Sequence, residues 1–191
     1  MRFTILAAEW NANLVALAKV MNSKVALPIY STFLLELKDG VLRITASDMD
    51  CSRCSTLPVM DMDRANEHNG SLCVTASFLL DSLKNLGDQP VTFEADEENL
   101  SVVIRYNNGQ FDMVGFPAKD YALPGTMGKS VQVTIEASVL NDSIGKSLYA
   151  VGNDDLRPIF CGIYFTKKGD ELQCAATNGS MLVRNIYKVE D

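Results

Sequence analysis

Hydrophobic positions in the first 60 residues predict a strand, a helix and then further strands. The helix is indicated by apolar residues at spacings of four, three and four, which at about 100° per residue form one stripe. The residues of this stripe are Trp10, Leu14, Leu17 and Met21. The segment FTI precedes the helix, and the β-favouring runs FLLEL and VLRITAS follow it. Lys38-Asp39-Gly40 separates these runs, and because Asp-Gly favours a tight turn we predict a hairpin there.

The same pattern returns 130 residues later without a gap, from residue 131 to residue 190. FTI aligns with VTI, LPIYSTFLLELKDG with RPIFCGIYFTKKGD, and VLRITASD with ELQCAATN. The second helix has its own apolar stripe, and Ser138 stands where an N-cap is expected. The residues of this stripe are Leu140, Ile144, Leu148 and Val151. Because apolar positions coincide while identities are few, we infer an ancient duplication of one structural element.

A third, more diverged copy lies between these two. SLCVTA predicts a strand, Leu79, Leu83 and Leu86 share a helical stripe, and VTFEA, LSVVIR and QFDMV predict strands separated by polar turns. The chain therefore consists of three βαβββ repeats, an α+β fold with helices packed on one side of antiparallel sheets. The segment PAKDYALPGTMGK predicts a linker after the second repeat. We predict a complete domain of two repeats over residues 1–124 and an incomplete second domain over 125–191.

Composition and charge narrow the class of protein. Apolar residues make up 47% of the 191 residues, yet no apolar run approaches the roughly 18 residues that cross a bilayer. Near the N-terminus, FTILAA is too short for the core of a secretory signal, so a cytoplasmic protein without membrane contact is predicted. The net charge of −7 argues against nucleic-acid binding over the whole surface, because contact with phosphates needs a basic surface.

The chain offers little catalytic or metal chemistry. Its five cysteines are scattered, and Cys51 and Cys54 lack the second pair of ligands that zinc needs, since His68 is the only histidine. We predict reduced thiols, no metal and no cofactor. The pairs Asp48 with Asp50 and Asp61 with Asp63 would suit a metal-dependent phosphoryl enzyme. Asp48 aligns with Asn178, however, and both follow a strand, where such residues usually shape a turn. The sequence predicts a protein that is not an enzyme.

Three segments resemble bacterial sliding clamps, the beta subunit of DNA polymerase III. LPIYSTFLLELKDGVLRITASDMD resembles the first domain, FPAKDYALP the following linker, and NDDLRPIFCGIYFTKKGDELQCAATNGSMLV the start of the second domain. The resemblance implies the DNA-clamp fold, in which two chains of three domains close into a homodimeric ring with helices lining the hole. It also implies a non-catalytic processivity factor of DNA replication. Its implied partners are double-stranded DNA bound without regard to sequence, the polymerase III alpha subunit, the clamp loader and other proteins with a clamp-binding motif.

DNA inside such a ring would meet the helix faces opposite the apolar stripes. These faces carry Lys19, Lys84, Lys146 and Tyr149. The family commonly places a basic DNA-contacting residue after the first helix, where Lys24 stands, and Arg157 occupies the equivalent region of the third repeat. Long basic side chains can contact phosphates without reading bases. The alternative is that these are ordinary solvated charges, because Asp81 and Asp142 share the same helix faces.

The resemblance also implies an apolar pocket on the second domain that receives a short peptide from partner proteins. Its first wall would be formed by Phe160, Thr177, Gly179, Ser180, Met181 and Leu182. Family members usually have histidine and then arginine where this chain has Ser180 and Met181, so the chain departs from the family pattern at these two positions. The alternative is that these six are strand-end and core residues. The alternative function is therefore a clamp-like protein-binding module, or truncated homologue, that does not encircle DNA.

Overall fold

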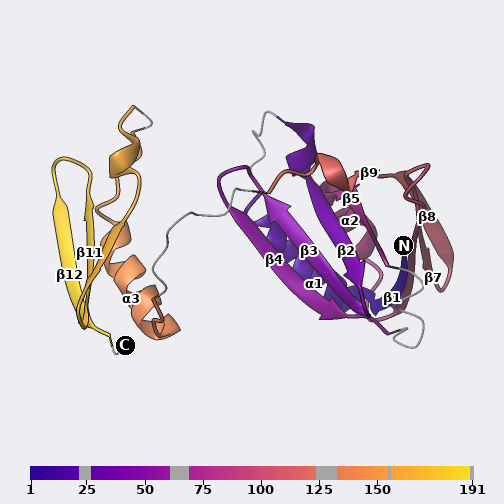
Figure 1. Cartoon of the computed structure of the whole chain (residues 1–191), viewed down its shortest axis with the longest axis horizontal. Coiled ribbons are helices and arrows are strands. Elements are labelled where there is room, and N and C mark those ends of the chain that lie inside the picture. Colours follow the sequence, from indigo (N-terminus) through magenta and orange to yellow (C-terminus); the bar gives the residue numbers. More distant parts are fainter. Residues whose placement is uncertain (22–26, 61–68, 124–132, 155, 190–191) are drawn as a thin grey trace. The chain divides into compact units, whose positions relative to one another are not determined.

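The computed structural model describes residues 1–21, 27–60, 69–123, 133–154 and 156–189. The chain divides into two compact units, Met1–Thr126 and Met127–Asp191, which we call the N-terminal and the C-terminal unit (Figure 1). The first two βαβββ repeats lie in the N-terminal unit and the third lies in the C-terminal unit.

The two repeats of the N-terminal unit have the same order of elements. The first contains β1 (Arg2–Leu6), α1 (Ala7–Ala18), β2 (Thr32–Lys38), β3 (Val41–Ser47) and β4 (Ser52–Pro58). The second contains β5 (Gly70–Thr75), α2 (Ala76–Leu83), β6 (Pro90–Ala95), β7 (Ser101–Tyr106) and β8 (Gly109–Val114), followed by the short β9 (Phe116–Pro117). The predicted strands and helices of both repeats are confirmed, whereas β9 lies in the segment that the sequence assigned to the linker.

Each repeat contributes its first strand to the sheet of the other repeat. The strand orders are β4-β3-β2-β5-β9 and β1-β6-β7-β8, and all neighbouring strands are antiparallel. In Figure 1, β1 accordingly lies with β7 and β8, apart from β2, β3 and β4. Because a strand from each repeat completes the other sheet, neither repeat can form its sheet fully without its neighbour.

The core of the N-terminal unit confirms the predicted helical stripes. Trp10 and Leu14 of α1 and Leu79 of α2 are fully buried. Trp10 packs edge-on against Phe3 and Phe93, with ring centroids 5.4 and 5.8 Å away. Burial of such large side chains stabilises the fold by about 1.5–3 kcal/mol each. The outer members of the stripes, Met21 and Leu86, lie beyond the helix ends but still pack against this core.

The predicted hairpin between β2 and β3 is confirmed. Lys38 pairs with Val41, and the two residues between them, Asp39 and Gly40, have φ angles of 51° and 79°. Positive φ at both central positions is the geometry of a type I′ turn, which matches the twist of the flanking strands. The Asp-Gly pair therefore fixes the register of the two strands.

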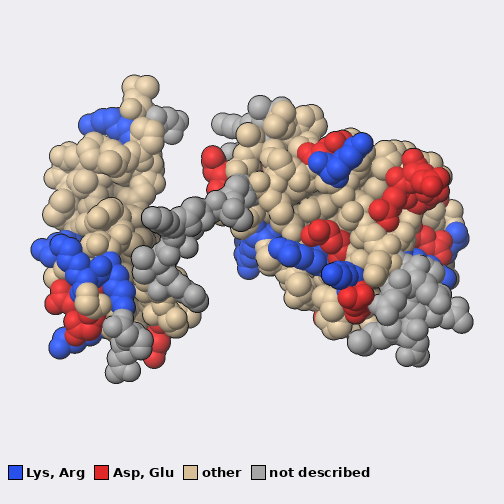
Figure 2. Space-filling model, viewed as in Figure 1, with Lys and Arg blue, Asp and Glu red and all other residues tan. Residues whose placement is uncertain are grey.

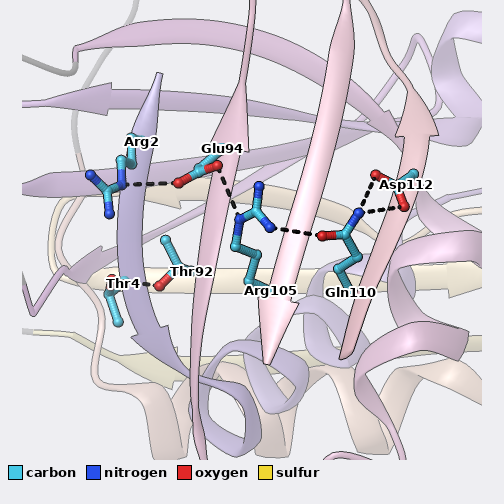
Figure 3. A network of polar contacts seen from close by, with 7 residues as sticks. All are labelled: Arg2, Thr4, Thr92, Glu94, Arg105, Gln110 and Asp112. Carbon is cyan, nitrogen blue, oxygen red and sulfur yellow. Dashed lines mark hydrogen bonds and ion pairs between the residues drawn. The ribbon is translucent and has the colours of Figure 1, made fainter. Parts of the chain in front are cut away.

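The outward face of the β1-β6-β7-β8 sheet carries a row of connected polar side chains (Figure 3). Glu94 on β6 pairs with Arg2 on β1 at 3.3 Å and with Arg105 on β7 at 3.4 Å. Arg105 also donates to Gln110 at 2.7 Å, and Gln110 donates to Asp112 at 3.0 Å. Charged side chains on an outer face keep a sheet soluble, so this surface is suited to water rather than to an apolar partner.

The C-terminal unit contains one helix and one sheet. Its elements are α3 (Ala137–Leu148), β10 (Tyr164–Lys168), β11 (Glu171–Thr177) and β12 (Leu182–Lys188), with strand order β10-β11-β12. The predicted opening strand VTI is wrong, because residues 133–136 form no strand. Their counterpart β1 pairs with β6 of a neighbouring repeat, and the described part of the C-terminal unit has no such second sheet.

The predicted N-cap of α3 is also wrong. The helix begins at Ala137, its cap residue is Glu136, and no side chain caps it. The hydroxyl of Ser138 instead donates to the carboxylate of Glu136 at 3.2 Å. Ser138 lies inside the first turn, two positions after the N-cap position from which a side chain could satisfy the free backbone N–H groups.

The apolar stripe of α3 faces away from its own sheet. Ser143 and Ser147 are fully buried against the sheet, while Leu140, Ile144 and Leu148 are 39%, 37% and 60% exposed. Asn185 on β12 donates to Ser147 at 3.2 Å. The first repeat has the same kind of contact between its helix and its last strand, Ser55 to Asn13 at 2.9 Å. The polar side of α3 thus packs on the sheet and leaves its leucines and isoleucine open.

Candidate functional site

The helix lysines proposed to face DNA all stand at helix C-terminal ends. Lys19 and Lys84 are the C-cap residues of α1 and α2, and Lys146 lies in the last turn of α3. Positive charge is favoured at this end by the helix dipole. Lys84 also pairs with Asp81 at 2.7 Å. A structural role therefore accounts for part of this pattern, as the solvated-charge alternative expects.

Lys146 belongs to a small polar network with Asp142 and Tyr187. Its Nζ lies 2.7 Å from Asp142, which also accepts a hydrogen bond from the Tyr187 hydroxyl at 3.2 Å. The hydrogen bond from Lys146 lowers the pKa of Asp142, and the same contact raises the pKa of Lys146. Tyr149, the C-cap of α3, is 66% exposed. Lys146 is therefore charged at neutral pH but already has an anionic partner.

Of the two loop residues proposed for DNA contact, Lys24 lies outside the described residues and Arg157 lies within them. Arg157 pairs with Asp154 at 2.7 Å, and its guanidinium lies over the ring of Phe160 at 5.2 Å from the centroid. A Cβ placed on Gly179 would lie 3.9 Å from Nη1 of Arg157. The structure therefore brings Arg157 together with Phe160 and Gly179, two residues assigned to the peptide pocket.

The remaining pocket residues belong to the turn that joins β11 to β12. Asn178 accepts hydrogen bonds from the backbone N–H groups of Ser180 and Met181 at 3.0 and 2.9 Å. Thr177 donates to the carbonyl of Met181 at 2.6 Å, and Gly179 has a φ of 91°. The turn leaves Met181 and Leu182 47% and 74% exposed. These apolar side chains thus lie open on the same turn.

The first repeat contains the same turn, and this turn includes Asp48 of the Asp48 and Asp50 pair. Asp48 accepts from the backbone N–H of Cys51 at 2.8 Å, and Ser47 donates to the carbonyl of Cys51 at 2.9 Å. Met49 stands where Gly179 does, with a φ of 87°. Asp48 therefore shapes a turn, as its alignment with Asn178 predicts. The described residues contain no group of three or more His, Cys, Asp or Glu placed to hold a metal ion, while Asp61, Asp63 and His68 lie outside them.

Sequence reasoning missed a small apolar cluster on the outer face of the β4-β3-β2-β5-β9 sheet. It consists of Tyr30, Leu34, Cys73 and Tyr121, which we call the outer cluster. The rings of Tyr30 and Tyr121 meet edge to face at 5.5 Å, and Tyr30 donates to the carbonyl of Ala122 at 2.9 Å. The segment after β9 thus lays one aromatic side chain onto this face. The repeat alignment contained a signal for this cluster, since Tyr30 aligns with Phe160.

The same face of the C-terminal unit is open. Tyr164, the counterpart of Leu34, is 67% exposed, whereas Leu34 is 5% exposed. Phe160, the counterpart of Tyr30, has Arg157 over its ring but no second aromatic residue among its described contacts. Of the residues assigned to the pocket, Phe160 is therefore the one whose counterpart, Tyr30, packs against Tyr121 in the N-terminal unit.

Charge is dispersed over the described surface. On the face drawn in Figure 2, acidic and basic side chains of the N-terminal unit are interspersed, and no continuous basic surface crosses its described residues. Among the described residues, no helix is long and apolar enough to span a membrane.

Comparison with known proteins identifies the fold. The DNA polymerase III subunit beta of Pseudomonas aeruginosa superposes with a TM-score of 0.88 at 23% identity, covering 99% of this chain and 50% of that one. The DNA polymerase sliding clamp of Bacillus subtilis superposes with a TM-score of 0.89 at 23% identity, covering 100% and 51%. Two interlocked βαβββ repeats followed by a third therefore define a protein of the DNA-clamp fold, as the sequence predicted.

Sequence comparison adds the family. Residues 1–124 match the family model of the DNA polymerase III beta subunit, N-terminal domain. The beta sliding clamps of Bacillus subtilis (strain 168) and Staphylococcus aureus (strain Mu50) are each 25% identical over 193 and 194 residues. The chain belongs to the DNA polymerase III beta subunit family, a family of non-catalytic subunits. It spans about half the length of these curated relatives, 51% in each case.

Proposed function

We propose that this chain forms part of a ring that encircles duplex DNA and tethers a replicative polymerase, without catalysing a reaction itself. The observation that carries the proposal is the family match over residues 1–124, supported by the interlocked repeats of the N-terminal unit. A ring holds DNA by topology, so it needs few phosphate contacts and tolerates an acidic chain. The polymerase III alpha subunit, the clamp loader and other proteins with a clamp-binding motif would be its partners.

DNA contact in this proposal falls to the helix ends and the loops that follow them. Lys19, Lys84, Lys146 and Tyr149 would face the duplex from the helices, and Lys24 and Arg157 from the loops. The pairing of Lys84 with Asp81 and of Lys146 with Asp142 weakens the attraction for phosphate. We therefore expect direct binding to be weak, independent of sequence and strongly reduced by salt.

Fluorescence anisotropy with a labelled duplex tests this contact at low salt. Lys19→Glu and Lys24→Glu should each weaken binding several-fold and reduce the salt dependence by about one phosphate contact. Lys119→Glu is the matched control, because Lys119 lies in the short helix Ala118–Asp120 next to the outer cluster. Equal loss in all three variants would mean that attraction is non-specific and would remove Lys19 and Lys24 from the DNA-facing set.

The second element of the proposal is a partner-peptide site at Phe160, Thr177, Gly179, Ser180, Met181 and Leu182. Tyr121 supports it, because in the N-terminal unit one aromatic side chain of an extended segment already packs on the equivalent surface. An apolar anchor in a partner peptide would contact Phe160 and Leu182 in the same way. Only one wall of the pocket lies within the 191 residues, so we expect weak binding to this chain.

Calorimetry with a peptide that bears a clamp-binding motif measures that affinity. Leu182→Asp should abolish the heat of binding, whereas Leu156→Asp should leave it unchanged, because Leu156 is 92% exposed and is not assigned to the pocket. Binding that survives Leu182→Asp would place the peptide elsewhere.

A clamp-like protein-binding module that does not encircle DNA is the second candidate function. The observation that favours it is that two of the three helix lysines are paired with aspartates while the apolar face around Phe160 and Leu182 is open. Peptide binding without any salt-sensitive DNA binding would support this candidate over the ring.

A further inference from the structure

The N-terminal unit shows how one βαβββ repeat is completed by another. The second repeat adds β5 to the edge of β2, the first repeat adds β1 to the edge of β6, and α1 packs on α2. Trp10 and Leu14 reach full burial only in this arrangement, since Phe93 on β6 contacts Trp10 from the neighbouring repeat. Completion thus has two parts, a reciprocal strand addition and a helix contact.

In the C-terminal unit, neither the strand addition nor the helix contact is completed within the described residues. β10, the counterpart of β2, is an edge strand, and within the described residues nothing pairs with its free side. Residues 133–136, the counterpart of β1, join no sheet within the described part of the chain. Leu140 and Ile144, the counterparts of Trp10 and Leu14, are 39% and 37% exposed where the N-terminal residues are fully buried. An open strand edge beside an exposed apolar helix face is an association site.

We propose that the C-terminal unit docks onto the C-terminal unit of a second copy of this chain. Each copy adds its segment 133–136 to the free edge of β10 in the other, and the two α3 helices pack together through Leu140, Ile144 and Leu148. In the N-terminal unit each repeat gives its first strand and its helix face to the other. Two identical copies of one repeat can exchange the same elements across a two-fold axis. Such an interface is isologous, with the same surface used on both sides. This dimer goes beyond the proposed function, since it requires neither DNA nor a partner protein.

The register of the added strand follows from the N-terminal unit. Thr75, the last residue before α2, pairs with Thr32, and Val74 and Leu72 pair with Phe33 and Leu35. Glu136 is the last residue before α3 and therefore corresponds to Thr75. Counting back from it, Ile135 pairs with Ile163 of the second copy and Val133 pairs with Phe165.

This register covers the exposed apolar residues of the C-terminal unit. Val133 and Phe165 are 38% and 39% exposed in the single chain. Their counterparts Leu72 and Leu35 are fully buried in the N-terminal unit. Phe165 also corresponds to Phe93, so it would meet Leu140 of the second copy as Phe93 meets Trp10. A register shifted by one residue would place polar residues in this contact, because successive side chains alternate between the faces of a strand.

Light scattering across a dilution series of the whole chain tests the dimer. Leu140→Asp should raise the dissociation constant at least ten-fold, because it places a charge in the apolar contact. Leu156→Asp makes the same side-chain change on a residue that is 92% exposed and outside the contact, and it should leave the dimer intact. Circular dichroism checks that both variants keep the fold. A wild-type chain that is monomeric at tens of micromolar, or a dimer equally affected by both substitutions, would overturn the proposal.

Cross-linking tests the strand addition separately from the helix contact. Thr134 would lie opposite Tyr164 of the second copy, as Cys73 lies opposite Leu34. With the exposed Cys51, Cys54 and Cys161 replaced by serine, a Thr134→Cys, Tyr164→Cys variant should form a disulfide between chains on mild oxidation. Thr134→Cys with Lys168→Cys is the out-of-register control and should not. A dimer in which neither pair forms the disulfide, or both do, would contradict the proposed strand addition. Because neither test uses DNA or peptide, their outcomes are independent of the proposed function.

Discussion

At the residue scale, the two copies of the turn differ at its conformationally demanding position. Gly179 has a φ of 91°, and its counterpart Met49 has a φ of 87°. Residues with a side chain are disfavoured in this region by roughly 1–2 kcal/mol, whereas glycine enters it freely. Asp48 and Ser47 hold the Met49 turn through backbone contacts, which offset that cost.

Gly179→Ala should therefore destabilise the C-terminal unit by about 1 kcal/mol. Gly162→Ala is the matched control, because its φ is not positive and a Cβ there would meet nothing within 4 Å. Urea unfolding followed by circular dichroism measures both. Equal stability of the two variants would show that the turn relaxes around the new side chain.

Tyr121 predicts a dependence of stability on pH. Burial raises the pKa of Tyr121 from 10.0 to about 12 and the pKa of Cys73 from 9.0 to about 12. Between pH 9 and 12 the unfolded chain releases protons that the folded chain retains. Stability of the N-terminal unit, full below pH 9, should therefore fall as the pH rises towards 12.

Tyr121→Phe should flatten this fall and leave the stability at pH 7 unchanged or slightly higher. The hydroxyl lies beside the main chain of Ser47 but forms no hydrogen bond of good geometry with it, so its removal sacrifices no contact. Tyr149→Phe is the control, since Tyr149 is 66% exposed. Urea titrations at pH 7 and pH 10.5 compare the three proteins. If the Tyr121 variant kept the full wild-type loss between these pH values, Tyr121 would not be a source of it.

At the scale of elements, the outer faces of the two sheets in the N-terminal unit have different chemistry. The β1-β6-β7-β8 sheet carries the polar row centred on Glu94 (Figure 3), and the other sheet carries the outer cluster covered by Tyr121. The row links strands through side chains that are a third to a half exposed, so each ion pair contributes little.

Glu94→Gln tests this estimate. We expect it to lower the free energy of unfolding by about 0.5–1 kcal/mol at low salt, because Arg2 and Arg105 both lose an anionic partner. At 1 M salt the difference should largely disappear, since exposed charges are screened. Glu36→Gln, which removes a single exposed pair with Arg43, is the control and should have a smaller effect. Thermal unfolding at two salt concentrations gives all four values, and a loss that is independent of salt would point to packing instead.

At the scale of the whole molecule, the reciprocal strand addition predicts where the chain can be divided. The N-terminal unit contains both partners of each exchange and a continuous core. We therefore expect residues 1–126 to fold as an isolated fragment with a cooperative transition. The C-terminal unit has three buried apolar residues in its main cluster, Leu172, Cys174 and Val189, and should unfold first.

Limited proteolysis followed by mass spectrometry checks this division. A stable fragment should end between Phe116 and Ser130, and the C-terminal unit should be lost from it. A protease-resistant product that extends to the C-terminus would show that the C-terminal unit is as stable as the N-terminal one.

The sequence by itself determined the repeats, the helical stripes, the Asp-Gly hairpin and the turn at Asp48, because each depends on local periodicity or local hydrogen bonds. It could not determine which strands pair, since β1 and β5 join the sheet of the other repeat and that choice is made by contacts distant along the chain. The same limit explains the correction at VTI, which reads as a strand but has no second sheet to join within the described residues. The stripe of α3 is open for the same reason, because no neighbouring repeat covers it within the described residues. Tyr121 reads as a linker residue, and only the tertiary structure places it on Tyr30, because burial of one side chain against another is decided by the packing of the whole unit.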